Sequence, residues 1–291
     1  MTTEDALLAA VAANPADDLP RLVYADWCDE NDRPVRAEFI RLQIEIAKKE
    51  TLPREVVNLF AHLWQRQQEL LDAHADELLG PLAGVVQPLN YEFRRGFLDW
   101  VALTLRDFLN ARDQLEPLVP VPEVRVSHAA FALDELASAP HAGLIAELNA
   151  ARDDLYLGGG FSGVITAELV AAAPALARLR RLFLANCNLG DDGVRELFTP
   201  AAFPALTDLD LTFNDVTDAG VIDLLNTGLP QRLKRLFLGG NPIGDQAAME
   251  LADRLGPVST FEHLNLRYGT NLGRAGHAAI LAAFGGRADL F

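Results

Sequence analysis

The chain of 291 residues is half hydrophobic and carries a formal net charge of −16 at pH 7. Nucleic acid and anionic lipid both bind basic patches, and the chain has no run of lysines or arginines, so we expect neither as a partner. No stretch approaches the roughly 18 apolar residues that a membrane helix needs, and the acidic start argues against a secretory signal. Two cysteines do not make a disulfide framework, so the expected location is cytoplasmic.

Residues 1–50 predict a small all-α domain of three short helices. The first ends at Pro15, the second carries Pro20 in its first turn, and the third starts at Pro34. A proline is tolerated in the first turn of a helix because the backbone N–H that it lacks has no partner there. The prolines therefore divide this segment into helices with sharp boundaries.

Residues 51–95 predict a helical connector. Apolar side chains recur at helical spacing from Pro53 to Pro81. Trp64 on this helix either faces a partner or packs the N-terminal domain against the units that follow. We favour the packing role, because the open end of a stack of repeats has to be covered.

Residues 96–291 predict stacked units of strand, turn and helix. A Leu-x-Leu pair recurs with starts at 155, 182, 209, 236 and 264, so the spacing is 27 residues three times and then 28. Two leucines two positions apart share one face of a strand, and units that cannot bury that face alone stack and share a core. Earlier strands near Phe97 and Val124 depart from this spacing.

The frame of these units continues with Cys187, Asn214 and Asn241 at one shared position after the leucine pair. Together with the order of strand, turn and helix, the frame resembles the ribonuclease-inhibitor-like class of leucine-rich repeat. The resemblance implies an α/β fold, namely a curved αβ solenoid with parallel strands on its concave face, here preceded by the all-α domain.

A second resemblance concerns the N-terminal domain. The run from Asp17 to Trp27 is DDLPRLVYADW, and the run from Arg36 to Gln43 is RAEFIRLQ. These runs resemble the bacterial repeat-companion domain, a short helical module found before leucine-rich repeats. The match departs from the family at Cys28, where leucine is usual. The resemblance implies an architecture and implies no reaction.

The repeat register predicts which side chains face outward from the sheet. We call the positions inside the leucine pairs the aromatic column and the positions before the pairs the charge column. The aromatic column holds Tyr156, Phe183, Asp210, Phe237 and Asn265, and the charge column holds Asp154, Arg181, Asp208, Arg235 and His263. Outward aromatics in one patch mark an interface, unless they pack flat on their neighbours. The alternating charges stabilise adjacent strands, or Arg181 and Arg235 meet acidic groups of a ligand.

The candidate motifs for catalysis, cofactor binding or metal binding each lack residues that their function requires. Gly158-Gly159-Gly160 lacks the Gly-Lys-Ser/Thr of a phosphate loop. Cys187 shares a frame position whose side chain serves the turn backbone, so we expect a structural role. The six histidines show no metal-ligand spacing, and the aspartates of the N-terminal run are expected to cap helices and pair with arginines. We therefore expect no enzyme.

Two functions remain. The first is a protein-interaction scaffold that holds a protein or peptide on the concave face. The position next to the aromatic column in each repeat is mostly small, as in Ala185, Thr212 and Gly239, and these residues leave a groove beside the aromatic side chains. The alternative is a companion protein that binds through its N-terminal helices, which predicts Tyr24 or Trp27 at the surface. The tail from Arg287 to Phe291 either begins another strand or covers the last one, or the final strand near Leu264 is a bare edge, which would allow self-association.

Overall fold

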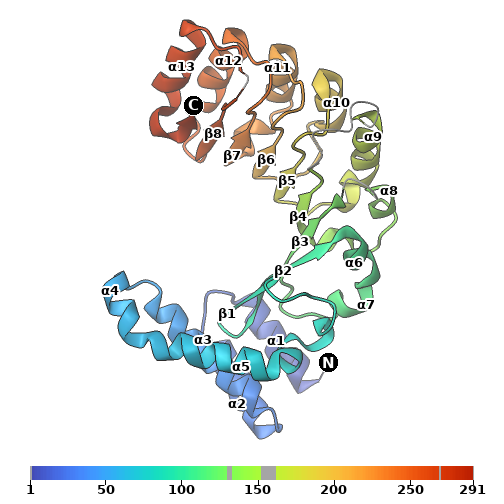
Figure 1. The fold of residues 1–291 in the computed structure, drawn as a ribbon. Helices are drawn as coiled ribbons and strands as arrows, with labels where there is room; N and C mark the ends of the chain where they lie inside the picture. The colour runs from blue at the N-terminus through green and yellow to red at the C-terminus, as the bar shows by residue number, and fades with distance from the viewer. Residues whose placement is uncertain (1, 130–132, 152–161, 269, 291) are drawn as a thin grey trace. The chain divides into compact units, whose positions relative to one another are not determined.

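The computed structural model describes residues 2–129, 133–151, 162–268 and 270–290. The chain divides into two compact units (Figure 1). The N-terminal unit comprises Met1–Leu103 and Asn110–Val124, and the repeat unit comprises Thr104–Leu109 and Arg125–Phe291. Among the described residues, none of the helices is both long enough and apolar enough to cross a bilayer.

The N-terminal unit begins with three helices, as predicted. They are α1 (Thr3–Ala13), α2 (Leu19–Glu30) and α3 (Pro34–Lys49). The Thr2 hydroxyl accepts from the Asp5 N–H at 3.1 Å, and the Asp5 carboxylate accepts from the Thr2 N–H at 2.7 Å. This reciprocal capping box satisfies backbone donors that the first turn leaves free.

The connector is a series of helices rather than one helix. It consists of α4 (Arg54–Val57), η1 (Asn58–Phe60), α5 (Ala61–Leu79) and η2 (Gly80–Leu82), and α5 is kinked at His74. Helix α5 packs on α3, where buried Phe39 joins Leu70, Leu78 and Phe93 in one core cluster. The connector is thus built into the N-terminal unit.

An antiparallel hairpin completes this unit and was not predicted. Strand β1 (Tyr91–Arg94) pairs with β2 (Phe97–Thr104) through a two-residue turn, so the all-α description holds only for the helices that precede the hairpin. Arg95 and Gly96 in the turn have φ of 51° and 86°, the pattern of a type I′ turn. A side chain at Gly96 would lie 2.5 Å from Ile40 Cγ1 and 2.6 Å from its Cα, so only glycine fits against α3.

Two short helices and a strand follow β2 in the chain: α6 (Leu105–Asn110), α7 (Arg112–Leu115) and β3 (Glu123–Ser127). In the repeat unit, strands alternate with helices. The strands are β4 (Ile145–Asn149), β5 (Arg181–Phe183), β6 (Asp208–Asp210), β7 (Arg235–Phe237), β8 (His263–Asn265) and β9 (Ala288–Asp289). The α-helices are α8 (Leu133–Leu136), α9 (Ser162–Ala172), α10 (Gly190–Leu197), α11 (Asp218–Asn226), α12 (Asp245–Leu255) and α13 (Arg274–Phe284). The 3₁₀ turns between them include η4 (Ala142–Leu144), η5 (Ala173–Ala175), η6 (Pro230–Arg232) and η7 (Gly285–Arg287).

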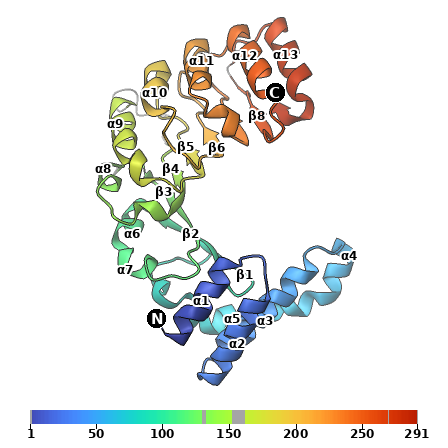
Figure 2. The same ribbon diagram turned by 180° about the vertical axis from the view of Figure 1, so that it is seen from behind.

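The repeat unit has the predicted solenoid organisation of parallel strands and covering helices. Strands β4 to β9 pair in chain order and in parallel, with Leu182, Leu209, Leu236 and Leu264 in register. Helices α9 to α13 form one layer and strands β4 to β8 the other, as both views show (Figures 1 and 2). The register leucines are fully buried between the layers, and each contributes roughly 1.5–3 kcal/mol.

A buried asparagine ladder joins successive repeats. The Asn241 side-chain oxygen accepts from the N–H groups of Asn214 at 2.9 Å and Val216 at 3.0 Å, and its nitrogen donates to the Leu211 carbonyl at 2.8 Å. Asn214 serves the previous repeat in the same way, accepting from the N–H groups of Cys187 at 3.0 Å and Leu189 at 3.2 Å. The Cys187 thiol donates to the Ala150 carbonyl at 3.3 Å. The structural role expected for Cys187 is confirmed.

A second ladder, of aspartates, caps the helices from one repeat to the next. The Asp191 carboxylate accepts from the Thr217 N–H at 2.8 Å, and that of Asp218 from the Gly244 N–H at 2.6 Å. Asp245 accepts from the N–H groups of Gly273 at 2.7 Å and Gly276 at 2.8 Å. Because N–H groups at the starts of α11, α12 and α13 are satisfied by the preceding repeat, these neighbouring repeats stabilise one another.

At the C-terminal end of the sheet the tail forms a further strand, which was one of the predicted arrangements, and the strand near Leu264 is not bare. Strand β9 pairs in parallel with β8, so Leu264 faces Ala288 and Asn265 faces Asp289. The described edge is therefore the two-residue β9. Very short edge strands offer little template for another chain, and self-association through this end stays a prediction.

Candidate functional site

The strand beside β5 is not the one that the 27-residue spacing predicts. Strand β4 occupies this place, with Leu148 opposite Leu182 and Asn149 opposite Phe183. The predicted pair at 155 and 157 lies outside the described residues, as do Tyr156 and Asp154. Asn149 and Glu147 therefore fill the column positions that the sequence analysis assigned to Tyr156 and Asp154.

The aromatic column alternates between phenylalanine and a short polar residue. In order along the sheet it holds Asn149, Phe183, Asp210, Phe237 and Asn265. Each polar member accepts from the backbone N–H two residues later, over 2.8 Å for Asp210 and 3.1 Å for Asn265. These three side chains thus close the ends of their strands. Phe183 and Phe237 are half-buried, and the Phe237 ring centroid lies 5.5 Å from that of His263.

The charge column forms ion pairs across adjacent strands. Arg181 Nε lies 2.5 Å from the Glu147 carboxylate, and Arg235 Nε bonds the Asp208 carboxylate. Asp208 is 5% exposed and accepts a further hydrogen bond from the Thr207 hydroxyl at 2.6 Å. The column therefore works as the predicted stabilising ladder. A role for Arg181 and Arg235 toward a ligand stays a prediction.

Sequence reasoning missed two exposed aromatic residues in the turns after β6 and β8. Phe213 and Tyr268 are 47% and 66% exposed, and their rings stack at 6.4 Å with 17° between the planes. The Phe213 ring lies over Gly240, where any side chain would collide with it. We call Phe213 and Tyr268 the turn aromatic pair.

The turn aromatic pair occupies a backbone position that disfavours aromatic residues. Asn186, Phe213, Gly240 and Tyr268 share one frame position, with φ of 58°, 54°, 71° and 61°. Asparagine and glycine adopt this left-handed conformation readily, whereas other residues pay roughly 1–2 kcal/mol. Strain of this kind clusters at functional sites, so an aromatic in an Asn/Gly column was the signal that could have identified the pair.

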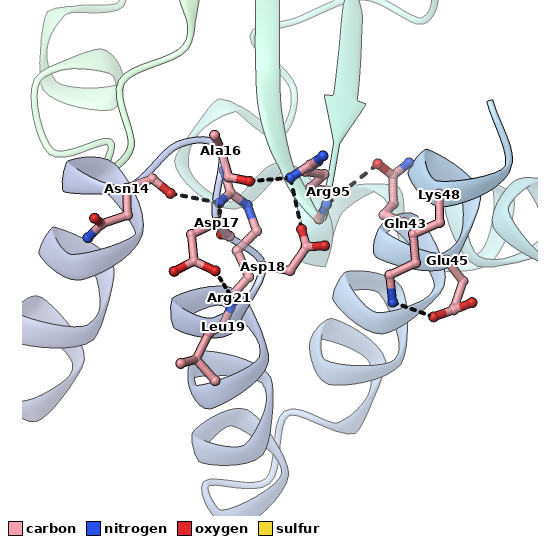
Figure 3. Close-up of polar contacts among 11 residues, drawn as sticks. Asn14, Ala16, Asp17, Asp18, Leu19, Arg21, Gln43, Glu45, Lys48 and Arg95 are labelled. Atoms are coloured by element: carbon pink, nitrogen blue, oxygen red, sulfur yellow. Dashed lines mark hydrogen bonds and ion pairs between the residues drawn. The ribbon is translucent and has the colours of Figure 1, made fainter. Parts of the chain in front are cut away.

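The polar residues of the N-terminal runs hold the helices and the hairpin together (Figure 3). Arg21 donates to the Asp17 carbonyl at 2.7 Å, and Asp17 accepts from the Leu19 N–H at 3.0 Å. Asp18 lies 3.0 Å from Arg95 of the hairpin turn. In the same unit Arg41 pairs with Asp26 at 2.7 Å, so the expected pairing with arginines is confirmed for Asp18 and Asp26. Asp18, the N-cap of α2, makes no side-chain capping hydrogen bond, and Arg21 bonds backbone carbonyls instead of an aspartate side chain.

The alternative function, binding through the N-terminal helices, predicted Tyr24 or Trp27 at the surface, and the structure gives this prediction little support. Tyr24 is buried, donates a hydrogen bond to Glu4 at 3.0 Å and stacks at 5.7 Å on the half-buried Trp27. Arg33 covers Trp27 at 5.2 Å from the ring. Burial raises the pKa of the Tyr24 hydroxyl, and burial likewise raises the pKa of the Cys28 thiol. Neither ring is presented as a free contact surface.

In the part of the chain that the structure describes, no group of three or more histidine, cysteine, aspartate or glutamate side chains is placed to hold a metal ion. Both cysteines are buried and free. The polar atoms of the aromatic and charge columns are engaged in strand closure and cross-strand pairs.

A family model for leucine-rich repeats matches residues 178–198 and 204–225. These segments contain β5 with α10 and β6 with α11, which are neighbouring repeats of the described solenoid. No curated protein matches the chain. Solenoids of this kind present extended surfaces for other proteins and are in general interaction modules without catalysis. The match therefore supports a leucine-rich repeat protein with a role in protein–protein interaction.

Proposed function

We propose that the repeat unit is a non-catalytic scaffold that binds a protein or peptide on the sheet face of β5 to β8. The observation that carries the proposal is the turn aromatic pair, two exposed rings held in a left-handed backbone beside the strand ends. A scaffold without a ligand gains little from aromatics at these positions, whereas aromatic side chains supply much of the affinity of interfaces.

The neighbouring surface suits an elongated partner. Phe183 and Phe237 are half-exposed on the sheet, and the next column along each strand holds the small residues Ala185, Thr212 and Gly239. Low side chains beside rings leave a shallow track in which an extended segment can lie. Arg181 and Arg235 border the track, so an acidic group on the partner would complement them.

Quantitative capture from lysate of the source cells tests this proposal. The intact chain is compared with Phe183→Ser/Phe237→Ser and with Phe213→Ser/Tyr268→Ser, each verified as folded by circular dichroism. Met249→Ser is the matched control, because Met249 is an apolar side chain of 48% exposure on helix α12. Loss of the same partners in both double variants, with retention in the control, is the expected result. Direct titration of the purified partner then measures the loss of affinity.

Equal capture by all variants would refute binding on the sheet face. In that case the alternative of the N-terminal helices is examined with Trp27→Ser, since Trp27 is the less buried of the two rings named for it. Loss of capture in this variant alone would transfer the binding function to the N-terminal unit and leave the repeats as a spacer.

A further inference from the structure

The N-terminal unit contains a cavity of about 380 Å³ that is rich in arginine. The α1–α2 loop, the turn of the β1–β2 hairpin and the segment at Pro120 surround it. Arg21, Arg94 and Arg95 line it, and Asp99 is the carboxylate among the lining residues. The rest of the wall is mostly apolar and includes Phe97.

Arg21 is held rigidly and retains an unused donor. It is 6% exposed, stacks over the Phe97 ring at 5.8 Å and donates through Nη1 to the carbonyls of Asn14 and Asp17. Its Nε atom is buried and has no hydrogen-bond partner among the described residues. A buried donor without an acceptor is unfavourable, and Arg21 is one of the residues that line the cavity.

Arg95 and Arg94 bring two more guanidinium groups to the same cavity. Arg95 has φ of 51° at a turn position that favours asparagine or glycine, and it bonds the Ala16 carbonyl at 2.7 Å and Asp18 at 3.0 Å (Figure 3). Arg94 is exposed, and its side chain has neither a hydrogen bond nor an ion pair within the described parts of the chain. Asp18 offsets the charge of Arg95, so the lining retains two further arginines, Arg21 and Arg94, against the one carboxylate of Asp99.

We propose that this cavity binds an oxyanion, a phosphate or a carboxylate, carried on an apolar or aromatic body. Guanidinium groups match the planar geometry of carboxylates and the oxygen spacing of phosphates through paired N–H donors. The anion accepts from the guanidinium groups of Arg21 and Arg94, and the apolar body lies against the wall formed by Phe97, Leu98 and Pro120. Desolvation by burial lowers the pKa of Arg21, with the nearby charge of Arg95 as the second cause, and a bound anion would oppose both effects.

Isothermal titration of the full chain tests the proposal with three probes: phenyl phosphate, benzoate and inorganic phosphate. Saturable binding of phenyl phosphate or benzoate that is stronger than binding of inorganic phosphate is expected, because the apolar wall adds affinity. The comparison of phenyl phosphate with benzoate distinguishes the two oxyanions. Arg94→Gln should weaken binding about tenfold or more, since it removes one charge-assisted contact.

Two further variants separate binding from folding. Arg21→Lys keeps the positive charge and removes the Nε–H donor, so it should also weaken binding. Arg112→Gln is the matched control, because Arg112 lies in the same unit and pairs with Glu116 on its own helix at 2.9 Å. The absence of binding to the intact chain, or an equal affinity of the Arg94→Gln and Arg112→Gln variants, would overturn the proposal. If Arg21→Lys does not fold, the exposed Arg94 still decides the outcome. The proposed function of the repeat unit does not depend on this result.

Discussion

The two units are stabilised by opposite strategies. In the repeat unit one contact is used repeatedly, since Asn214 and Asn241 make equivalent hydrogen bonds 27 residues apart, each to the preceding repeat. In the N-terminal unit each polar contact occurs once, such as Arg41 with Asp26 and Asp29. Repeated contacts join nearest neighbours only, whereas unique contacts fix one particular arrangement of helices and hairpin.

The placement of the two cysteines allows this difference to be measured. Cys28 is buried in the N-terminal unit and Cys187 in the repeat unit. A buried thiol reacts with an alkylating reagent only when its surroundings open, and the pKa of Cys28 is raised by burial, which lowers its thiolate fraction further. Labelling of each cysteine in increasing urea therefore reports the opening of each unit separately.

The largest effect is expected from Gly96→Ala in the N-terminal unit. The substitution places a side chain against the α3 backbone at Ile40 and also strains a residue at φ of 86°, so we expect a loss of about 3–5 kcal/mol. Cys28 should become labelled at much lower urea, while labelling of Cys187 shifts less. Gly286→Ala is the control, because nothing lies within 4 Å of an added side chain there. An unchanged Cys28 profile would show that the turn does not hold this unit together.

The asparagine ladder predicts the next largest effect, in the other unit. Asn241→Ala leaves the N–H groups of Asn214 and Val216 and the Leu211 carbonyl without their partners. Each unsatisfied buried group costs about 1–3 kcal/mol, with part of the loss recovered by water, so we expect roughly 2–4 kcal/mol in total. This loss of stability is measured by urea unfolding, with the labelling of Cys187 as the signal for the opening of the repeat unit. The exposed Asn271→Ala is the control, and equal midpoints for the two variants would contradict the role of the ladder.

A smaller loss is expected when one aspartate cap is removed. Asp245→Ala frees the N–H groups of Gly273 and Gly276 at the start of α13, which should cost about 1–2 kcal/mol. Thermal unfolding compares this variant with Asp253→Ala, an exposed aspartate within α12. Hydrogen exchange should show faster exchange in α13 than in α11. Uniform exchange across the repeats would argue against capping between neighbours.

The smallest effect concerns pH and the N-terminal unit. The hydrogen bond from Arg66 holds the pKa of Glu38 below its ordinary value of 4.5, and Arg66 Nε lies 2.7 Å from this carboxylate. A lowered folded-state pKa means that the stabilisation is present above pH 4.5 and is lost as the pH falls through the folded-state value. Because both side chains are largely exposed, we expect less than about 1 kcal/mol. Glu38→Gln should reduce the dependence of the urea midpoint on pH below pH 4.5 relative to the intact chain, and at pH 7 it should change stability by no more than this amount. An unchanged pH dependence in the variant would assign the acid sensitivity to other carboxylates.

The sequence by itself determined the features whose signals are local or periodic. The helices α1 to α3 follow from their prolines, because a proline limits the backbone within one turn. Strands β5 to β8 follow from the leucine pairs, because a fixed period places every side chain on a known face. The pair of Arg235 with Asp208 was predicted for the same reason, whereas Arg181 pairs with Glu147 of β4, which the 27-residue spacing did not place beside it.

Only the tertiary structure decided which segments fill places that carry no such signal. Strand β4 lacks the Leu-x-Leu pair and has Leu148 with Ala146 and Ala150, so its position beside β5 depends on long-range pairing. The β1–β2 hairpin is specified by the close fit of Gly96 against α3. The Gly96 N–H also donates to the side-chain oxygen of Gln43 on α3, which lies 53 residues earlier in the chain. The turn aromatic pair and the arginine cavity arise in the same way. Residues far apart in the chain acquire a shared role only when packing has brought them together, and neither a local repeat period nor a helix cap in the sequence predicts such contacts.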